Sequence, residues 1–271
     1  MFSSRFFKKA LLMFFFVNTF YVANSQVTFD LGLKGDIGPA YFLNPNLSKS
    51  GTEQSYRLTL SDNYGIHAAL NFDGGSCLEM DILPGALRQG YSGSFSSNGV
   101  LPGSGMTYDA GETYTSKMQI NIIDIPFLYR YETPKGTYFE GGMVYEMISS
   151  VTYMASYAGP AFSVSENVSN QYPVGDFLLT GGLGKNIRIV KGHNFFFSWG
   201  ARFAYGLLDL QGVDGHGQDL FGPSAFPLYH PNSGSPYYAD YHETRSFVIT
   251  LNAGVFYRFS PGGNSSVNMG F

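Results

Sequence analysis

A thirteen-residue segment near the end of the chain, Phe247 to Phe259, constrains the fold more than any other feature. Every second residue of FVITLNAGVFYRF is apolar, whereas Thr250, Asn252 and Arg258 fall between them. This period of two predicts a β-strand with one apolar and one polar face. The segment exceeds the roughly 9 to 11 residues that a tilted strand needs to cross a bilayer. Because lipid would not tolerate Arg258, we expect a wall of a transmembrane barrel, apolar outward and polar inward.

The composition favours the same class. Charged residues make up only 13% of the chain and aromatic residues 17%, and there are 34 glycines. Even so, no stretch after residue 25 approaches the roughly 20 apolar residues of a spanning helix. Clustered lysine and arginine are missing, so the sequence does not indicate nucleic-acid binding. A single cysteine, Cys77, cannot form an internal disulfide.

The N-terminus has the pattern of an export signal. Basic residues at positions 5, 8 and 9 precede an apolar run from Ala10 to Val22, and Ala23-Asn24-Ser25 offers the small residues that a signal peptidase reads. We predict a signal peptide at residues 1–25, removed before Gln26; a membrane-anchoring helix is the alternative, but Asn18 interrupts the run. The first 25 residues hold three of the 16 basic residues and none of the 20 acidic ones, which leaves a mature net charge of −7.

The alternation recurs and predicts eight strands, separated by connections of two kinds. The strands are expected near residues 27–41, 64–72, 78–82, 123–131, 137–148, 176–190, 195–207 and 247–259. Three connections have about three to five residues; the other four, near 43–63, 92–116, 152–175 and 211–244, have twenty or more. Bacterial barrels have short periplasmic turns and long outer loops. We therefore predict an all-β fold, an eight-stranded antiparallel transmembrane up-and-down β-barrel over residues 26–259. A soluble β-sandwich also alternates, but it would not need such long unbroken apolar faces.

Four blocks carry a family resemblance. NIIDIPFLYRY (121–131), TYFEGGMVYEMI (137–148), FFFSWGARFAYGLLDL (195–210) and LNAGVFYRF (251–259) resemble the PorT-like outer-membrane β-barrel proteins of Bacteroidota, an OmpA-like group of eight-stranded barrels. The resemblance implies an outer-membrane barrel. Some members of the family resemble accessory factors of the type IX secretion system, although the motifs specify the barrel better than a role.

Charged residues on the polar faces predict a lumen charge network. Its members by alternation are Asp30, Lys34, Glu79, Asp81, Asp124, Arg130, Glu140, Arg202 and Arg258, joined by Asp36 and Glu146. Side chains just fill an eight-stranded barrel, and an unpaired buried charge is costly. We therefore expect ion pairs across the lumen, a plugged barrel and no sustained ion conductance. A catalytic carboxylate pair among these acids is the alternative.

A lipid-modifying outer-membrane enzyme is the competing class. Its active site would need a nucleophile and a base within about 3 Å of each other, and the inward candidates are Ser198 and His67. Both residue types more often satisfy hydrogen bonds inside a barrel, and no G-x-S-x-G motif occurs. We therefore predict no catalytic residues, no enzyme activity and no cofactor.

The last long connection, residues 211–244, is the most distinctive predicted surface. Aromatic side chains enrich recognition surfaces, and we name as a candidate interaction loop the residues Phe221, Phe226, Tyr229, Tyr237, Tyr238 and Tyr241. The alternative is a lid over the barrel mouth. Asp214, His216 and Asp219 could bind a metal, but the EF-hand spacing is absent, and we predict no metal site.

Residues 260–271 are expected to form a short periplasmic tail without a peptidoglycan-binding domain, and Phe259 or Phe271 would serve as the C-terminal aromatic signal of barrel assembly. The expected partners are outer-membrane lipid, the barrel assembly machinery during biogenesis and an envelope protein bound through the outer loops. The sequence favours a structural or accessory role in the cell outer membrane, in secretion or envelope assembly. The alternative is a loop-based surface receptor or adhesin.

Overall fold

The computed structural model describes residues 27–43, 54–94, 98–100, 107–157, 162–169, 172–190, 193–210 and 243–260. The predicted signal peptide, the candidate interaction loop with its six aromatic residues, the Asp214–His216–Asp219 group and all but the first residue of the predicted tail lie outside these residues. Among the described residues, no helix has the length and apolar character needed to cross a membrane.

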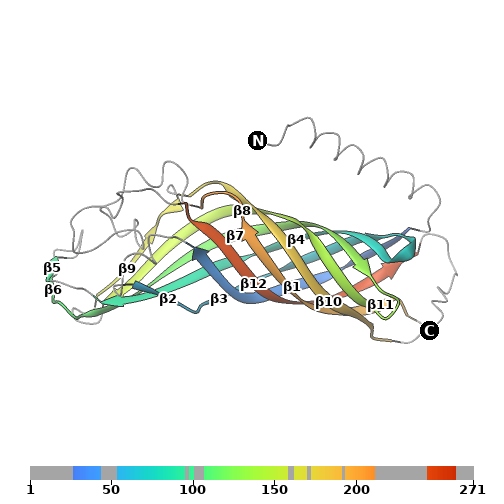
Figure 1. Ribbon diagram of the computed structural model, residues 1–271, viewed down its shortest axis with the longest axis horizontal. Coiled ribbons are helices and arrows are strands. Elements are labelled where there is room, and N and C mark those ends of the chain that lie inside the picture. Colours follow the sequence, from blue (N-terminus) through green and yellow to red (C-terminus); the bar gives the residue numbers. More distant parts are fainter. Residues whose placement is uncertain are drawn as a thin grey trace.

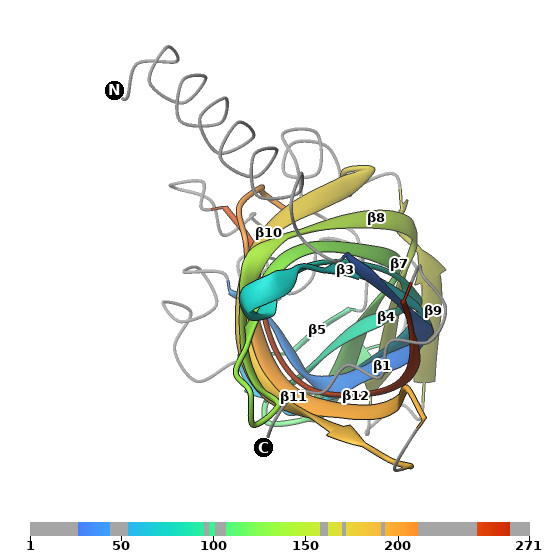
Figure 2. The same ribbon diagram turned by 90° about the vertical axis from the view of Figure 1, so that its right-hand side faces the viewer.

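Eight antiparallel strands close into a ring. They are β1 (Thr28–Leu43), β3 (Leu60–Asn71), β4 (Ser76–Ser94), β7 (Thr113–Glu132), β8 (Thr137–Tyr157), β10 (Gly175–Arg188), β11 (Phe195–Gly206) and β12 (Arg245–Phe259). Their order is β10-β11-β12-β1-β3-β4-β7-β8, and β8 pairs with β10 to complete the circle, as the view along the barrel shows (Figure 2). The predicted eight-stranded antiparallel barrel is confirmed.

The remaining elements are short. They are β2 (Gln54–Arg57), the 3-10 turn η1 (Asp73–Gly75), β5 (Gly99–Val100), β6 (Thr107–Tyr108) and β9 (Phe162–Asn167). Strand β2 pairs with the end of β4, β9 pairs with the end of β8, and β5 pairs with β6. Strands β5, β6 and β9 lie at one end of the molecule, at the left in Figure 1.

The short turns lie at the other end. The predicted turn at 73–75 places Gly74 at a φ of 82° and Gly75 at 83°, which is left-handed backbone that glycine adopts without steric cost. In the 133–136 turn, Gly136 has a φ of 79° and its N–H donates to the carbonyl oxygen of Thr133 at 2.8 Å. By the usual arrangement of such barrels, this is the periplasmic end.

The outer surface of the ring carries an apolar belt bounded by aromatic side chains. Leu33 is 63% exposed and Leu251 65%, because each points outward from its strand. One aromatic girdle lies near the short turns and the other on the opposite side of the belt: Phe29, Tyr131, Phe139, Phe195, Tyr257 and Phe259 in the first, and Tyr41, Tyr64, Tyr145, Phe177, Tyr205 and Phe247 in the second. Along β12 the two girdles are separated by the stretch from Phe247 to Tyr257, which matches the roughly 9–11 residues of a tilted spanning strand. The barrel is therefore built to span a membrane.

One wall of the barrel continues well beyond the second girdle. Strands β4, β7 and β8 have 19, 20 and 21 residues, whereas β3 and β11, which belong to the rest of the ring, have 12 each. We call the wall extension the segments 86–94, 113–121 and 149–157 together with β2 and β9. The prediction of long connections near 92–116 and 152–175 was wrong in this respect, because strand occupies part of each of them.

A reversal of polarity hides the extension of β7 from the sequence pattern, and a bulge changes which face of β8 is buried. In the membrane-spanning part of β7 the odd-numbered residues, such as Phe127, are apolar and exposed, whereas in the extension the buried apolar residues are even-numbered, such as Met118. In β8, a bulge at Ser149 shifts the register, because Asn121 pairs with Ser150 and Ile122 with Ile148. A bulge inserts one residue and so exchanges the two faces of a strand.

Candidate functional site

We call the end of the barrel with the short turns its lower end. From there upward, the interior has a charged part, then an acidic cavity and then an apolar plug. The lower part is built by residues that alternate inward on β1, β4, β7, β8 and β11. Its buried members are Lys34, Asp36, Glu79, Asp81, Arg130, Glu140 and Arg202. All seven belong to the lumen charges expected from the sequence.

Glu79 lies at the centre of this network. Its carboxylate contacts the ammonium group of Lys34 and the guanidinium group of Arg130, and Arg202 Nη2 lies 3.4 Å from its Oε1. Lys34 Nζ also lies 3.2 Å from Asp81 Oδ2. Buried charges persist only when they are paired, and here three cations surround one carboxylate.

Arg202 and Arg130 connect the network to the opposite wall. Arg202 Nε donates to Glu140 Oε1 at 2.7 Å, and Arg130 Nη2 donates to Glu140 Oε2 at 3.3 Å. Arg202 Nη1 also lies 3.6 Å from Asp36 Oδ2. These contacts join β1, β4, β7, β8 and β11 across the lumen, so side chains fill the space that a channel would need.

A second ion pair lies closer to the short turns. Arg258 donates two hydrogen bonds of 2.8 Å to the two carboxylate oxygens of Asp30, in the bidentate geometry that guanidinium favours. Glu132 Oε2 lies 3.6 Å from Arg258, whose guanidinium carbon stands 4.8 Å from the ring centre of Phe196. Sequence reasoning missed Glu132, because it ends its strand and alternation gives no face there.

His67 and Ser198, the candidates for a catalytic pair, are both buried but do not form one. His67 Nδ1 lies 2.7 Å from Asp81 Oδ1, and the histidine ring packs 5.4 Å from that of Phe256. Ser198 Oγ and His67 Nε2 have no hydrogen-bond partner, so no bond joins the two residues. His67 therefore serves the charge network.

His67, Glu79 and Asp81 have ligand atoms within 4.8 Å of one another, a spacing that could suit a metal ion. Lys34 already contacts both carboxylates of this group. The protein thus supplies its own cation at this point, and the group needs no metal for charge balance.

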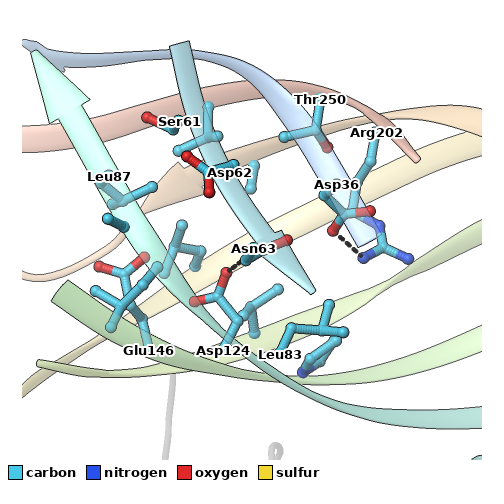
Figure 3. A pocket seen from close by; sticks show the side chains of 17 residues that line it. Asp36, Ser61, Asp62, Asn63, Leu83, Leu87, Asp124, Glu146, Arg202 and Thr250 are labelled. Carbon is cyan, nitrogen blue, oxygen red and sulfur yellow. Dashed lines mark hydrogen bonds and ion pairs between the residues drawn. The ribbon is translucent and has the colours of Figure 1, made fainter. Parts of the chain in front are cut away.

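Above the network lies a cavity of about 40 Å³ whose charged lining residues are four acids and one cation, Arg202 (Figure 3). Asp36, Asp124 and Glu146 contribute carboxylates to its lining, and Asn63 Nδ2 donates to Asp124 Oδ2 at 2.7 Å. Within the described part of the chain, no ion pair includes Asp124 or Glu146. Of the predicted lumen charges, Asp124 and Glu146 are thus near the network without joining it.

Asp176 is a third buried acid at this level, on β10 directly opposite Glu146. Its Oδ1 accepts hydrogen bonds from the backbone N–H groups of Phe177 and Leu208 at 2.7 and 3.0 Å, and Ser246 Oγ donates to its Oδ2 at 3.3 Å. Sequence reasoning missed this residue because the next inward position, Leu178, is apolar, so that the face has no clear polarity.

The mouth of the barrel is closed by an apolar plug. Its buried side chains come from most of the ring strands and include Phe42, Leu87, Tyr91, Tyr114, Met118, Ile120, Ile122, Val151, Tyr153, Leu178, Leu210 and Val248. Packing of this kind excludes water. The lumen is therefore closed by ion pairs below and by apolar side chains above.

The outer face of the wall extension is polar. Gln119 Nε2 donates to Asn121 Oδ1 at 3.1 Å, and Asn121 Nδ2 donates to Ser150 Oγ at 2.8 Å. Next to this row, Arg88 contacts the Asp62 carboxylate. Such a face suits water and not lipid, so the membrane ends near Asn121 and the extension stands above it.

An open groove of about 590 Å³ lies on the extension between the 57–59 segment and β7, β8 and β9. We call it the extension groove; it is lined by Arg57, Leu58, Thr59, Gly90, Thr115, Ser116, Lys117, Met154, Ala155, Ser156, Ser163 and Ser165. Its lining has two cations and several hydroxyl groups but no acidic side chain. Leu58, at its edge, is 67% exposed.

Comparison with known proteins gives likeness to solved structures only. No protein-family model matches the sequence, and no curated protein matches it. The resemblance to the PorT-like family therefore stays a prediction.

Three of the similar solved structures are outer-membrane or surface proteins of bacteria. Neisserial surface protein A is 12% identical with a TM-score of 0.34, over 86% of this chain and 97% of its own. OprG from Pseudomonas aeruginosa is 11% identical with a TM-score of 0.35, over 88% and 98%. The outer-membrane protease OmpT from Escherichia coli is 10% identical with a TM-score of 0.32, over 87% and 97%. Since these TM-scores lie below 0.5, the function proposed below rests on this chain's own residues.

Proposed function

We propose that the protein is an integral outer-membrane β-barrel with a structural or accessory role, which binds an envelope partner through its extracellular part. The observation that carries this proposal is the wall extension. In it, three strands of the barrel continue beyond the membrane belt as a sheet with a polar outer face. A barrel that only had to span the membrane would not need β7 and β8 to be 20 and 21 residues long.

The closed lumen supports a role outside the barrel. Arg130, Arg202 and Lys34 hold the lower interior together through Glu79, and the apolar plug fills the mouth. No sustained conductance is expected in a planar bilayer, and stable single-channel steps would contradict this. The closed lumen therefore disfavours transport through the centre and favours a function of the surface that stands above the membrane.

The extension groove is the described surface that best suits a partner. Arg57 and Lys117 attract negative charge, whereas the exposed side chain of Leu58 offers apolar contact. Interfaces combine apolar contact with polar groups at their edges. A protein segment that carries acidic residues beside an apolar one fits this lining. The candidate interaction loop would add its aromatic residues to the same side of the membrane.

The test is a mild-detergent pull-down of the tagged protein from its own outer membrane. Three samples are compared: the unaltered chain, a variant without residues 215–240, and the double variant Arg57→Glu and Lys117→Glu. We expect a stoichiometric partner in the first sample, and its loss in one or both of the others. A Lys135→Glu variant, altered in the 133–136 turn at the opposite end, is the matched control and should keep the partner.

Heat-modifiability on detergent gels shows whether each variant still folds, because folded barrels resist unboiled detergent. A partner retained by both altered samples would contradict the proposal. The absence of any partner from the unaltered chain would also contradict it. The better hypothesis would then be a self-sufficient barrel that binds lipid or a ligand.

A surface receptor or adhesin is the second candidate. The hydroxyl-rich and basic lining of the extension groove favours it, because sulfated or phosphorylated glycans are recognised by such groups. Binding of the purified protein to anionic glycans, lost in the Arg57→Glu and Lys117→Glu variant, would favour this candidate over an accessory role.

A further inference from the structure

The acidic cavity in the middle of the lumen contains oxygen atoms without hydrogen-bond partners. They are Asp36 Oδ1, Asn63 Oδ1, Asp124 Oδ1 and Glu146 Oε1, and all four residues line the cavity. Glu146 is only 1% exposed. Buried polar atoms are satisfied in the great majority of cases, so four of them around one cavity indicate a ligand.

The charges around the cavity are unbalanced. Asp124 on β7 lies directly opposite Glu146 on β8, and like charges at such positions repel each other. Arg202 is engaged by Glu140 at 2.7 Å and by Asp36 at 3.6 Å. In the described part of the chain, no lysine or arginine pairs with either Asp124 or Glu146. Neither carboxyl group therefore has a cation paired with it.

The chemistry of the four oxygen atoms without hydrogen-bond partners indicates the kind of ligand. All four are oxygens, three from carboxylates and one from an amide, and this is the donor set that hard cations such as Ca²⁺ and Mg²⁺ prefer. Asn63 Nδ2 donates to Asp124 Oδ2 and so holds this carboxylate in place, whereas the amide oxygen of Asn63 points away from Asp124 and Glu146 (Figure 3). The cavity of about 40 Å³ also has room for water, which completes the coordination of such ions.

We propose that Asp124 and Glu146, together with water, bind a divalent cation, with Ca²⁺ the best match, inside the barrel between the charge network and the apolar plug. The two carboxylates supply the charge of −2 that a divalent ion neutralises, while Asp36 stays with Arg202. The ion joins β7 and β8, the neighbouring strands on which Asp124 and Glu146 lie, and so fixes the base of the wall extension. This site is independent of the partner surface proposed above.

The first test is titration calorimetry of the full chain in detergent, after chelator treatment, with CaCl₂ as the probe. We expect one binding event per barrel, weakened at least about tenfold in Glu146→Gln, because the charge of the ligand set governs affinity in such sites. Asp73→Asn, which removes an exposed carboxylate from the short turn at 73–75, is the matched control and should bind like the unaltered chain.

Thermal unfolding gives a second readout, in which calcium should change the difference in stability between Glu146→Gln and the unaltered chain. In excess chelator, Glu146→Gln should unfold at a higher temperature than the unaltered chain, because one repulsive charge is gone. In excess CaCl₂ the unaltered chain should gain stability while the variant gains little, since only the former binds the ion.

Three results would overturn the cation site. One is the absence of both calcium-dependent heat and a thermal shift in the unaltered chain. Another is an equal response in Glu146→Gln, which would place the ion elsewhere, for example at Asp214, His216 and Asp219. The third is stabilisation by mild acid but not by CaCl₂, which would mean that protons neutralise the two carboxylates.

Discussion

The wall extension continues three strands of the membrane-spanning belt, but the two regions have opposite polarity. In the belt, Leu251 faces outward and is exposed whereas Arg202 faces inward and is buried; in the extension, Gln119 faces outward and Tyr153 is buried inside. The first arrangement suits lipid outside and ion pairs inside. The second is that of a water-soluble sheet packed on one face. The solvent around a strand, rather than the strand itself, thus decides which face must be apolar.

The largest expected effect comes from comparing a buried ion pair of the lumen with a partly exposed ion pair on the outer surface. Arg202→Ala should destabilise the barrel by about 3–5 kcal/mol, because it leaves Asp36 buried without its cation and removes from Glu140 the closer of its two cations. Urea unfolding of the protein refolded into lipid vesicles measures this.

Arg88→Ala is the control for that change. Arg88 pairs with Asp62 at the partly exposed outer surface, so its loss should cost no more than about 1 kcal/mol. Similar costs for the two variants would mean that the lumen network is not what holds the wall together.

A lysine on the outer face should distinguish the two regions directly. Leu251→Lys, on the lipid-facing belt, should cost about 2–4 kcal/mol in vesicles, because the charge must stay near the middle of the bilayer. Gln119→Lys, on the polar face of the extension, should change stability by less than about 0.5 kcal/mol. A large penalty for Gln119→Lys would move the membrane boundary above Asn121.

The smallest effect concerns the polar row at this boundary. Asn121→Ala removes the hydrogen bond to Ser150 Oγ and the one accepted from Gln119. We expect a loss of about 1 kcal/mol or less, because water replaces these bonds at a partly exposed site. Hydrogen exchange of the 113–121 and 149–157 segments should become faster while that of the belt stays unchanged; faster exchange throughout the barrel would contradict this local role.

Alternation in the sequence was sufficient for the belt but not for the extension. The strand predicted at 137–148 ends where the bulge at Ser149 begins, and the strand predicted from 123 begins where β7 changes polarity. In both places the chain continues as strand. In β7 the apolar positions move from odd to even numbers, so a pattern with a fixed phase reads the change of solvent as the end of a strand. In β8 they remain odd-numbered, because the bulge exchanges the two faces where the surroundings change.

The sequence by itself determined the class of fold, the number of ring strands and most of the charges that face the lumen, because these follow from a period of two and from the intolerance of lipid for charge. Only the tertiary structure decided which of those charges meet. Arg202 on β11 reaches Glu79 on β4 and Glu140 on β8, whereas Asp124 and Glu146 are left beside a cavity without a cation. The physical reason is that pairing depends on the height of each residue in a tilted, closed wall, and that height is set by strand register, bulges and ring closure, which no single strand contains.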